Sequence, residues 1–580
     1  MTSRTPGRRF RLPRELFDEL ASGGGSPEAV AFLDRAERSR RLLLLRETLD
    51  LLEQRPEVRE RRAAFDHAWH LLTEVSRGHP DVAEDLLMSP QLGSWLSHLL
   101  RRLQGTAGGP PLGTDVAHLF CLCLTAMVRA GLDGRLEVPV RDGGVVLPGL
   151  GLVRLDAPPE VTVATATLTG PRLTLDWAGG SVTVRPDRAG RTGHWLPLRT
   201  LHGASVPLDD VDPYRDLSEP IPPEPLDEET AARWQKVFAE AAAVLEPPTS
   251  RPGGLRVADV RRVVPQTGPA LPRTARSGPV FSATTSDAFA SMIVGLPDDG
   301  LTLAEAMVHE FQHSKLGALL HLFHLLDDDR GEAWYAPWRP DPRHLTGLLH
   351  GVYAFTGVAG FWRERLHDGG ADPALAAFTF ALLRLQCRLA LRTLRTEARL
   401  TDVGRLLTHG LAGTLDGWLR EPVAPDAARR AGAAARANLV EWRLRNLRCG
   451  DEERSLLRCE RRAGRPAPSP GPWRAHLAPG PFWTDALLPL YRTPPAEPAE
   501  DPDTHLVLGA HGTARARYED VLRGDPRDPH ALTGWLLASA AGDPAYRRLL
   551  RRPERLHALE PQDPAELAAA ATWLSSGPGG

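Results

Sequence analysis

The stretch His309-Glu-Phe-Gln-His313 is the part of the sequence that decides the fold. Residues four apart lie on one face of an α-helix, so the two imidazoles can hold one metal ion, and the glutamate can reach the same centre. Thr302 and Glu305 form a Ser/Thr-x-x-Glu capping box, which predicts that the helix begins there. We therefore predict a metal-binding helix; the alternative is a pair of core histidines satisfied by protein neighbours.

Composition and charge limit the kinds of protein this chain can be. Its 580 residues are enough for three or four domains of about 150 residues each. The charged fraction of 25% is that of a globular protein, and the net charge of −3 argues against binding nucleic acid. The five cysteines include no CxxC pair, which argues against a disulfide framework or a zinc ribbon. We interpret Cys121 and Cys123 as core residues.

The sequence shows no segment that we expect to enter a membrane. The N-terminal residues are charged and lack the apolar segment of a secretory signal. We find no apolar run of the length that a membrane-spanning helix needs. The sequence therefore predicts a cytoplasmic protein without a membrane partner.

The spacing of apolar residues changes along the chain and predicts four regions. Residues 1–134 have helical spacing, and residues 135–210 alternate in the manner of strands, with turn signals at Gly170-Pro171 and Gly179-Gly180. Residues 230–465 are mostly helical and contain the HExxH motif, so we predict that they form the metal-binding catalytic domain. Residues 503–580 read as helical pairs, with weak similarity to a tetratricopeptide unit.

These regions together predict an α+β fold that is mainly helical. It would have a zincin-like HExxH helix core, a small antiparallel β-unit, and helical N- and C-terminal parts. The 280–295 segment directly precedes the motif helix and reads as extended, so it could offer a strand edge to an extended peptide.

A catalytic metal site needs a third protein ligand, and the sequence leaves two candidates. Glu332 follows His313 at the spacing of thermolysin-like and aminopeptidase-like zincins, but it lies in a loop rich in helix breakers. His350 lies in an apolar helix two elements later, and an antiparallel return of that helix would present it to the same ion. We favour His350, and a solvated Glu332 is the simpler reading of that residue.

Three strings carry a resemblance to a known family. They are His309-Glu-Phe-Gln-His313-Ser-Lys-Leu, Tyr335-Ala-Pro-Trp-Arg-Pro-Asp-Pro-Arg343 and Leu349-His-Gly-Val-Tyr-Ala354. In these strings the chain resembles the bacterial HExxH-motif peptide-modification proteins, also described as 2-oxoglutarate-dependent HExxH-type peptide β-hydroxylases. The resemblance is specific over about residues 300–365 and looser elsewhere.

The resemblance implies a role in maturing a ribosomally synthesised precursor peptide. The implied reaction is β-hydroxylation of a peptide residue with Fe(II), O2 and 2-oxoglutarate. Under this hypothesis His309, His313 and His350 would hold the iron. Arg339 and Arg343 would bind the far carboxylate of 2-oxoglutarate, for which a forked guanidinium is well suited.

Two points keep a second function open. The usual ligand set of a non-haem iron oxygenase is two histidines and a carboxylate, so three histidines depart from it. A carboxylate ligand in place of His350 would restore it, and Glu332 is the better candidate for this and Glu364 the weaker one. The motif alone also fits a zinc-dependent HExxH metallopeptidase, in which Glu310 is the general base that activates water. In an oxygenase Glu310 would instead orient a ligand or the peptide.

Overall fold

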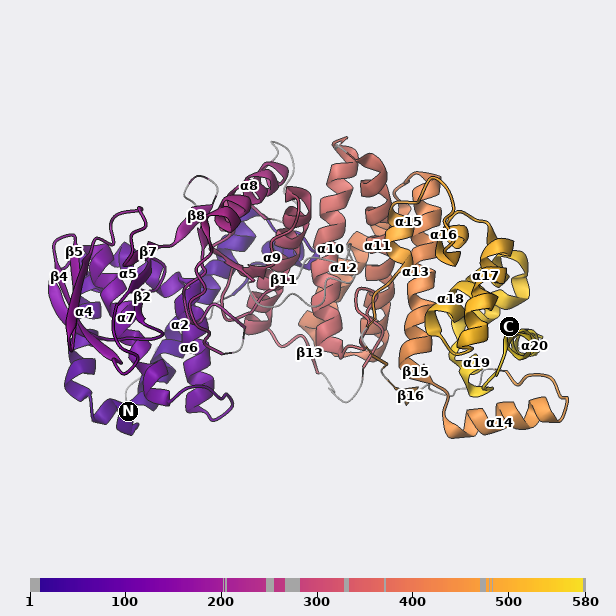
Figure 1. Cartoon of the computed structure of the whole chain (residues 1–580), viewed down its shortest axis with the longest axis horizontal. Helices are drawn as coiled ribbons and strands as arrows, with labels where there is room; N and C mark the ends of the chain where they lie inside the picture. The colour runs from indigo at the N-terminus through magenta and orange to yellow at the C-terminus, as the bar shows by residue number, and fades with distance from the viewer. Residues whose placement is uncertain are drawn as a thin grey trace. The chain divides into compact units, whose positions relative to one another are not determined.

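The structure is a computed structural model of the chain. It describes residues 11–201, 203, 206–217, 219–246, 255–266, 282–327, 333–369, 372–469, 476–478, 480–481 and 483–576. Helices make up 59% of it and strands 12%, which confirms the mainly helical α+β class (Figure 1).

The described residues form two compact units. The first takes in residues 11–20 and 24–324, and the second takes in residues 21–23 and 325–576. The boundary at residue 324 falls inside the range 230–465 that we predicted as one catalytic domain. The HExxH motif belongs to the first of these units.

The first unit begins with a helical region, as the spacing predicts. Its helices are α1 (Arg14–Ala21), α2 (Pro27–Leu52), α3 (Pro56–Arg59), α4 (Arg62–Gly78), α5 (Pro80–Met88), α6 (Pro90–Leu103) and α7 (Leu112–Ala130). The side chains of Ser26 and Ser89 cap α2 and α6, and a proline follows each of them at the first helical position. Such Ser-Pro pairs begin helices because they satisfy a terminal N–H group and fix φ.

Two antiparallel sheets follow the helices. One has the order β1 (Gly134–Pro139), β4 (Val163–Thr169), β5 (Arg172–Trp177), β6 (Gly180–Val184), and the other has the order β2 (Gly144–Leu147), β3 (Gly151–Arg154), β7 (Trp195–Pro197). The turns between Thr169 and Arg172 and between Trp177 and Gly180 confirm the predicted hairpins. Both sheets share a hydrophobic core with α7, which includes Cys121 and Cys123.

A third sheet extends beyond residue 210, where we expected the β-unit to end. Its five strands have the order β11 (Ser282–Ala283), β12 (Ser291–Val294), β10 (Arg262–Pro265), β9 (Val206–Leu208), β8 (Arg199–Leu201). The strand β10 is parallel to both β9 and β12, so the sheets are not all antiparallel. Alternation along one strand does not reveal its partner, which is why the end of the β-unit was misplaced.

Helices α8 (Glu228–Leu245) and α9 (Gly300–Leu322) complete the first unit. They approach closely at Gly300, where an added Cβ would lie 2.3 Å from the Cβ of Glu240. Helix α9 also packs against α2 and against the strands β11 and β12. The motif helix is therefore held by two helices and by the edge of a sheet.

The second unit is built mainly from helices. They are α10 (Leu345–His367), α11 (Pro373–Glu397), α12 (Asp402–Arg420), α13 (Pro425–Asn446), α14 (Asp451–Arg462), α15 (Leu487–Arg492), α16 (Pro502–Val507), α17 (His511–Gly524), α18 (Pro529–Gly542), α19 (Glu554–Ala558) and α20 (Pro564–Ser575). Two short antiparallel pairs, β13 (Leu326–Asp327) with β14 (Arg399–Leu400) and β15 (Leu447–Arg448) with β16 (His476–Leu477), join segments far apart in sequence.

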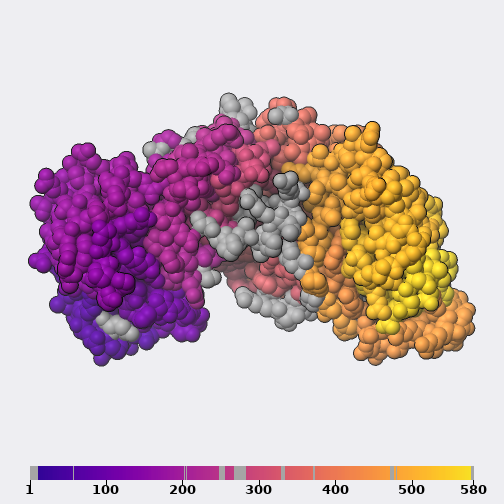
Figure 2. All heavy atoms as spheres, viewed as in Figure 1, coloured from indigo at the N-terminus to yellow at the C-terminus, as the bar shows by residue number. Residues whose placement is uncertain are grey.

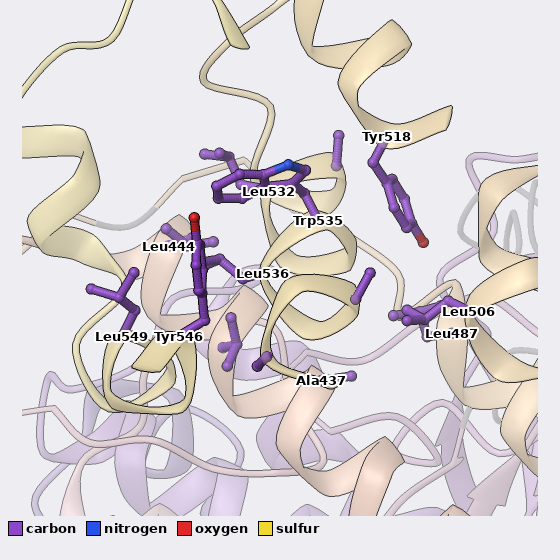
Figure 3. Close-up of a cluster of buried hydrophobic side chains, with 14 of the residues drawn as sticks. Ala437, Leu444, Leu487, Leu506, Tyr518, Leu532, Trp535, Leu536, Tyr546 and Leu549 are labelled. Atoms are coloured by element: carbon purple, nitrogen blue, oxygen red, sulfur yellow. The ribbon is translucent and has the colours of Figure 1, made fainter. Parts of the chain in front are cut away.

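The C-terminal helices share one hydrophobic core with the helices before them. Figure 3 shows Trp535, Leu536 and Tyr546 gathered around α18, and the rings of Trp535 and Tyr546 meet edge to face at 5.8 Å. The same core contains Phe378 of α11 and Leu444 of α13. In Figure 2 the orange and yellow atoms of this region are packed closely together. Residues 503–576 are therefore part of the second unit.

His530 joins three helices of this core through charge. Its Nδ1 lies 3.2 Å from Glu441 Oε2, and its Nε2 lies 3.0 Å from both carboxylate oxygens of Asp503. Both ring nitrogens must carry a proton to donate to both carboxylates. Burial disfavours the charged ring, but the hydrogen bonds to Asp503 and Glu441 outweigh it and raise the pKa of His530 from 6.5 to about 10.

Replacement of His530 by glutamine should destabilise α18 in a pH-dependent way. Because the pKa of His530 is higher in the folded protein, its contribution is complete below pH 6.5 and is lost as the pH rises toward 10. We expect a loss of roughly 3 kcal/mol near neutral pH, the low end for breaking a buried ion pair. Amide hydrogen exchange of α18 at pH 6 to 10 measures this contribution.

The control for this prediction is His505→Gln on α16. His505 has no ion pair among the residues that the structure describes. Its replacement should leave the exchange of α18 unchanged at every pH. The ionic role of His530 would be contradicted if the His530→Gln variant and the original protein differed in the exchange of α18 by the same amount at every pH up to 10.

Within the part of the chain that the structure describes, two helices differ from the expectation that no segment could span a membrane. By length and composition, α7 and α11 are long and apolar enough to do so. In each of them 72% of the apolar window is buried inside the protein, as in the core helix of a folded domain. Packing within each unit therefore accounts for their apolar surface.

Burial also determines the state of the cysteines. All five are free thiols, and all except Cys459 on α14 are buried. Burial raises the pKa of the other four thiols to about 12; they are Cys121, Cys123, Cys387 and Cys449. The prediction that Cys121 and Cys123 are core residues is confirmed.

Candidate metal centre

The motif helix begins earlier than the capping box predicts. Asp299 is the N-cap of α9, and its carboxylate accepts hydrogen bonds from the backbone N–H of Thr302 at 2.8 Å and from the Thr302 hydroxyl at 2.9 Å. Thr302 thus lies inside the helix. An aspartate caps a helix at least as well as a threonine, so the cap is formed three residues before the expected position.

The two motif histidines lie on the most accessible face of this helix. The residues on its other faces are buried against the neighbouring helices and strands, among them Met307, Phe311 and Leu316. His309 and His313 are half-buried. A small ligand could therefore reach the imidazoles from outside the core.

The geometry of the histidine pair fits a shared metal ion. The Nε2 atoms of His309 and His313 are 3.0 Å apart, and the ring planes are inclined by 81°. If each nitrogen lies about 2.1 Å from the ion, a separation of 3.0 Å between the two Nε2 atoms gives an N–metal–N angle of about 90°. This is the angle between adjacent ligands of an octahedral ion, whereas tetrahedral zinc would separate the nitrogens by about 3.4 Å. A hydrogen bond between one protonated and one bare Nε2 would have the same length.

The charge state of the first histidine also fits a ligand. Burial lowers the pKa of His309 to about 4, so its ring is neutral at pH 7. A histidine must be neutral to coordinate a metal ion. The first unit therefore holds at least one imidazole in the state that coordination requires.

Glu310 lies on the adjacent, buried side of the helix and is held by a hydrogen bond from the segment that follows β11. Its side chain is 1% exposed, and its Oε2 accepts a hydrogen bond of 2.6 Å from the hydroxyl of Thr284, which follows β11. Burial raises the pKa of Glu310 to about 6, although hydrogen bonds from Ser282 and Thr284 lower it. The carboxylate is therefore tied to the strand segment.

The third ligand of the metal is not evident from the residues described. Among residues 11–576 without the gaps noted above, no group of three or more His, Cys, Asp or Glu side chains is placed to hold a metal ion. His350 belongs to the second unit, and Glu332 lies outside the described residues. Both therefore remain predictions from the sequence.

His350 lies on α10 and is half-buried. Burial, together with the neighbouring His344, lowers its pKa to about 4. This ring too is neutral at pH 7, as coordination requires. His344 itself is the N-cap of α10, and its Nδ1 lies 3.3 Å from the backbone nitrogen of Gly347.

Arg339 and Arg343 come from one loop of the second unit and share one carboxylate. Arg339 Nε is 2.8 Å from Asp341 Oδ1, and Arg343 Nε is 3.1 Å from Asp341 Oδ2. Two backbone hydrogen bonds between Trp334 and Arg343, of 2.6 and 2.9 Å, close the loop. The loop thus carries a net charge of +1, and burial beside Arg339 lowers the pKa of Arg343.

The arginine loop is anchored on α10 next to His350. The ring of Trp338 stacks on Phe355 with centroids 4.8 Å apart and lies directly over Gly351, where an added Cβ would be 2.1 Å from the ring. An added Cβ at Gly347 would lie 3.7 Å from Arg343 Cδ. Arg343 therefore lies along the helix about one turn from His350.

Several residues of these sites were not predicted from the sequence. Thr284 and Asp341 contact residues that we did predict, Glu310 and Arg339, whereas Trp338 anchors the arginine loop by stacking on Phe355. The Pro-rich loop sequence indicated stiffness, but the aromatic anchor has no local signal. Gly351 directly after His350 was the one sign that something packs closely there.

No protein-family model matches this chain, and no curated protein matches it. The resemblance to the HExxH-motif peptide-modification proteins therefore stays a prediction that rests on the quoted strings.

Proposed function

We propose that this chain is an Fe(II)/2-oxoglutarate-dependent oxygenase that hydroxylates the β-carbon of residues in a ribosomally synthesised precursor peptide. The observation that supports this best is the pair His309 and His313, whose Nε2 atoms face each other at 3.0 Å on the accessible face of a buried helix. The sequence resemblance supplies the cosubstrate and the class of peptide. When bound, the iron would supply oxygen activation coupled to decarboxylation of 2-oxoglutarate.

The residues of the chain would bind and orient the reactants. His309 and His313 would hold the iron, with His350 as the third ligand and Glu332 as its competitor. Arg339 and Arg343 would bind the far carboxylate of 2-oxoglutarate, and the net positive charge of their loop supports this role. Glu310 is tied to Thr284, which suits an orienting group. The packing of α9 against β11 and β12 is compatible with a zincin-like core.

A zinc-dependent metallopeptidase is the second candidate, because the HExxH motif serves both chemistries. One feature favours the oxygenase. The Thr284 hydroxyl occupies one oxygen of Glu310, which a peptidase needs as its general base toward water.

The proposed function can be tested with the purified full chain. Anaerobic addition of Fe(II) and 2-oxoglutarate should produce a visible charge-transfer band, and oxygen should then convert 2-oxoglutarate to succinate. Candidate precursor peptides should gain the mass of one oxygen. Peptide cleavage with zinc and no succinate would favour the peptidase, and failure to bind either metal would refute both.

Replacement of Gly351 by alanine should detach the arginine loop from α10. The added methyl group would overlap the rigid ring of Trp338, which must then leave its stack on Phe355. Loss of a charged hydrogen bond to 2-oxoglutarate should weaken its binding by about tenfold or more. Near-UV circular dichroism reports the ring, and calorimetric titration of the iron-loaded protein reports the affinity.

Gly360→Ala on the same helix is the matched control. There an added Cβ would be 3.4 Å from the nearest atom of Trp418, which is an ordinary contact. This variant should keep both the aromatic signal and the affinity. An unchanged near-UV spectrum in the Gly351→Ala variant would show that Trp338 does not anchor the loop.

A further inference from the structure

The carboxylate of Glu310 connects the motif helix to the sheet edge, where it receives hydrogen bonds from Ser282 of β11 and from Thr284 in the segment that follows. The hydroxyl of Thr284 donates to Glu310 Oε2 at 2.6 Å and lies 3.3 Å from the backbone carbonyl oxygen of Glu310. The shorter distance is typical of a hydroxyl bound to an ionised carboxylate. Glu310 directly follows the metal-binding candidate His309, so its orientation bears on that site.

The contact is made inside the protein, where a carboxylate needs a donor. Glu310 is 1% exposed, so water does not solvate it freely. A buried carboxylate without a hydrogen-bond donor is costly, and a hydroxyl on the facing segment satisfies it. Removing that hydroxyl would leave Glu310 with the Ser282 hydrogen bond alone, and the oxygen that Thr284 serves would lose its donor.

The segment that carries Thr284 is itself fixed on both sides. Asp287 forms ion pairs with Arg101 at 2.7 Å and with Arg40 at 3.3 Å. The backbone approaches α6 so closely that an added Cβ at Gly93 would lie 2.3 Å from the carbonyl oxygen of Asp287. On the side of α9, an added Cβ at Gly317 would lie 3.0 Å from the Cβ of Ser286. The scaffold therefore determines where the Thr284 hydroxyl points.

We infer that Thr284 is a positioning residue of the candidate metal centre: it fixes the carboxylate of Glu310 beside the His309–His313 pair. This inference rests on the proposed function, because it assigns Thr284 a role in turnover. Thr284 acts only through Glu310. Its removal should therefore impair the reaction without removing a metal ligand.

The test compares Thr284→Val with Thr284→Ser in the full chain. Valine keeps the shape and removes the donor, and serine restores the donor. With Fe(II), the valine variant should bind the metal within twofold of the original protein. With ascorbate supplying the two electrons that the absent peptide would otherwise give, it should convert 2-oxoglutarate and O2 to succinate and CO2 about tenfold to a hundredfold more slowly, as when a group that orients a site is lost. The serine variant should recover most of the rate with an unchanged KM for 2-oxoglutarate.

A second measurement needs neither metal nor turnover. If the hydroxyl serves Glu310, the change in thermal midpoint caused by Glu310→Gln should shrink in the Thr284→Val background, because the two residues share one hydrogen bond. Thr285→Val is the matched control: its hydroxyl accepts the backbone N–H of Asp287 at 3.2 Å on the same segment. It should show no such coupling to Glu310→Gln.

The outcomes separate the two hypotheses. If the original protein converts 2-oxoglutarate but Thr284→Val does so equally fast, the inference is wrong and the proposed function stands. If the original protein binds no iron and forms no succinate, the proposed function fails and the role of Thr284 in turnover fails with it. Additive effects in the thermal cycle would overturn the contact itself.

Discussion

Replacement of His313 by alanine should abolish tight metal binding while the protein stays folded. The imidazole of His313 provides one of the two facing Nε2 atoms, and α9 is held by contacts on its other faces. Loss of a group that merely orients a ligand weakens binding by about 10- to 100-fold, so loss of a ligand itself should cost at least about a hundredfold. Equilibrium dialysis against buffered Fe(II) or Zn(II), with metal analysis of the protein, measures the effect.

His321→Ala is the control on the same helix. His321 lies about two turns beyond His313, and its Nδ1 is 3.5 Å from Glu37 Oε2, so it has a carboxylate partner of its own. This variant should bind metal like the original protein. If His313→Ala also binds metal unchanged, the pair is a hydrogen-bonded couple of core histidines and the enzymatic proposal is refuted.

Replacement of Glu37 by alanine should strongly destabilise the first unit. Glu37 pairs with Arg41 at 3.1 Å, and the side chains of both residues are no more than 1% exposed. Removal of Glu37 would leave the guanidinium buried with only carbonyl partners, those of Leu87 and Ser89. Breaking a buried pair by removing one partner costs about 3–5 kcal/mol. Native-state hydrogen exchange of α2 measures the loss.

The pH dependence provides a further check on Glu37. Burial alone would raise its pKa, but His321, Arg41 and Arg40 outweigh burial and hold the pKa below 4.5. Its contribution is therefore present at neutral pH and is lost as the pH falls through that lowered value. The difference in stability between the Glu37→Ala variant and the original protein should therefore shrink as the pH falls.

Glu84→Ala provides the matched comparison. Glu84 of α5 pairs at 2.6 Å with Arg38, which lies on α2 next to Glu37. The side chains of Glu84 and Arg38 are 41% and 45% exposed. Exposed pairs contribute about 0–1 kcal/mol. If Glu37→Ala and Glu84→Ala lowered the free energy of unfolding equally, burial would not be what makes the Glu37–Arg41 pair important.

The sequence predicted best where local spacing determines structure. The helical N-terminal region, the two hairpins after residue 163 and the motif helix all follow from spacing and turn residues. Asp299 was missed as the cap of α9 because Thr302 offered a plausible cap three residues later. The first residue of such a helix depends on which of two nearby polar side chains accepts the hydrogen bond from the free backbone N–H groups.

Long-range pairing was beyond the sequence for a physical reason. The strand β10 pairs with β9, more than fifty residues earlier, and the C-terminal helices share a core with Phe378 of α11. Such contacts depend on complementary surfaces, whereas residue spacing reveals only which face of an element is apolar. For the same reason the sequence indicated Glu310 but not Thr284, and Arg343 but not Trp338.

The burial of the cysteines makes thiol labelling a measure of local unfolding in this chain. A maleimide dye added to the native protein has one accessible target, Cys459 on α14. The remaining thiols react only when the helices around them separate, because they are buried and hardly ionise at neutral pH. The labelling rate of Cys121 would therefore report local unfolding of the first unit, and that of Cys387 would report local unfolding of the second. One mass-spectrometric time course measures both rates.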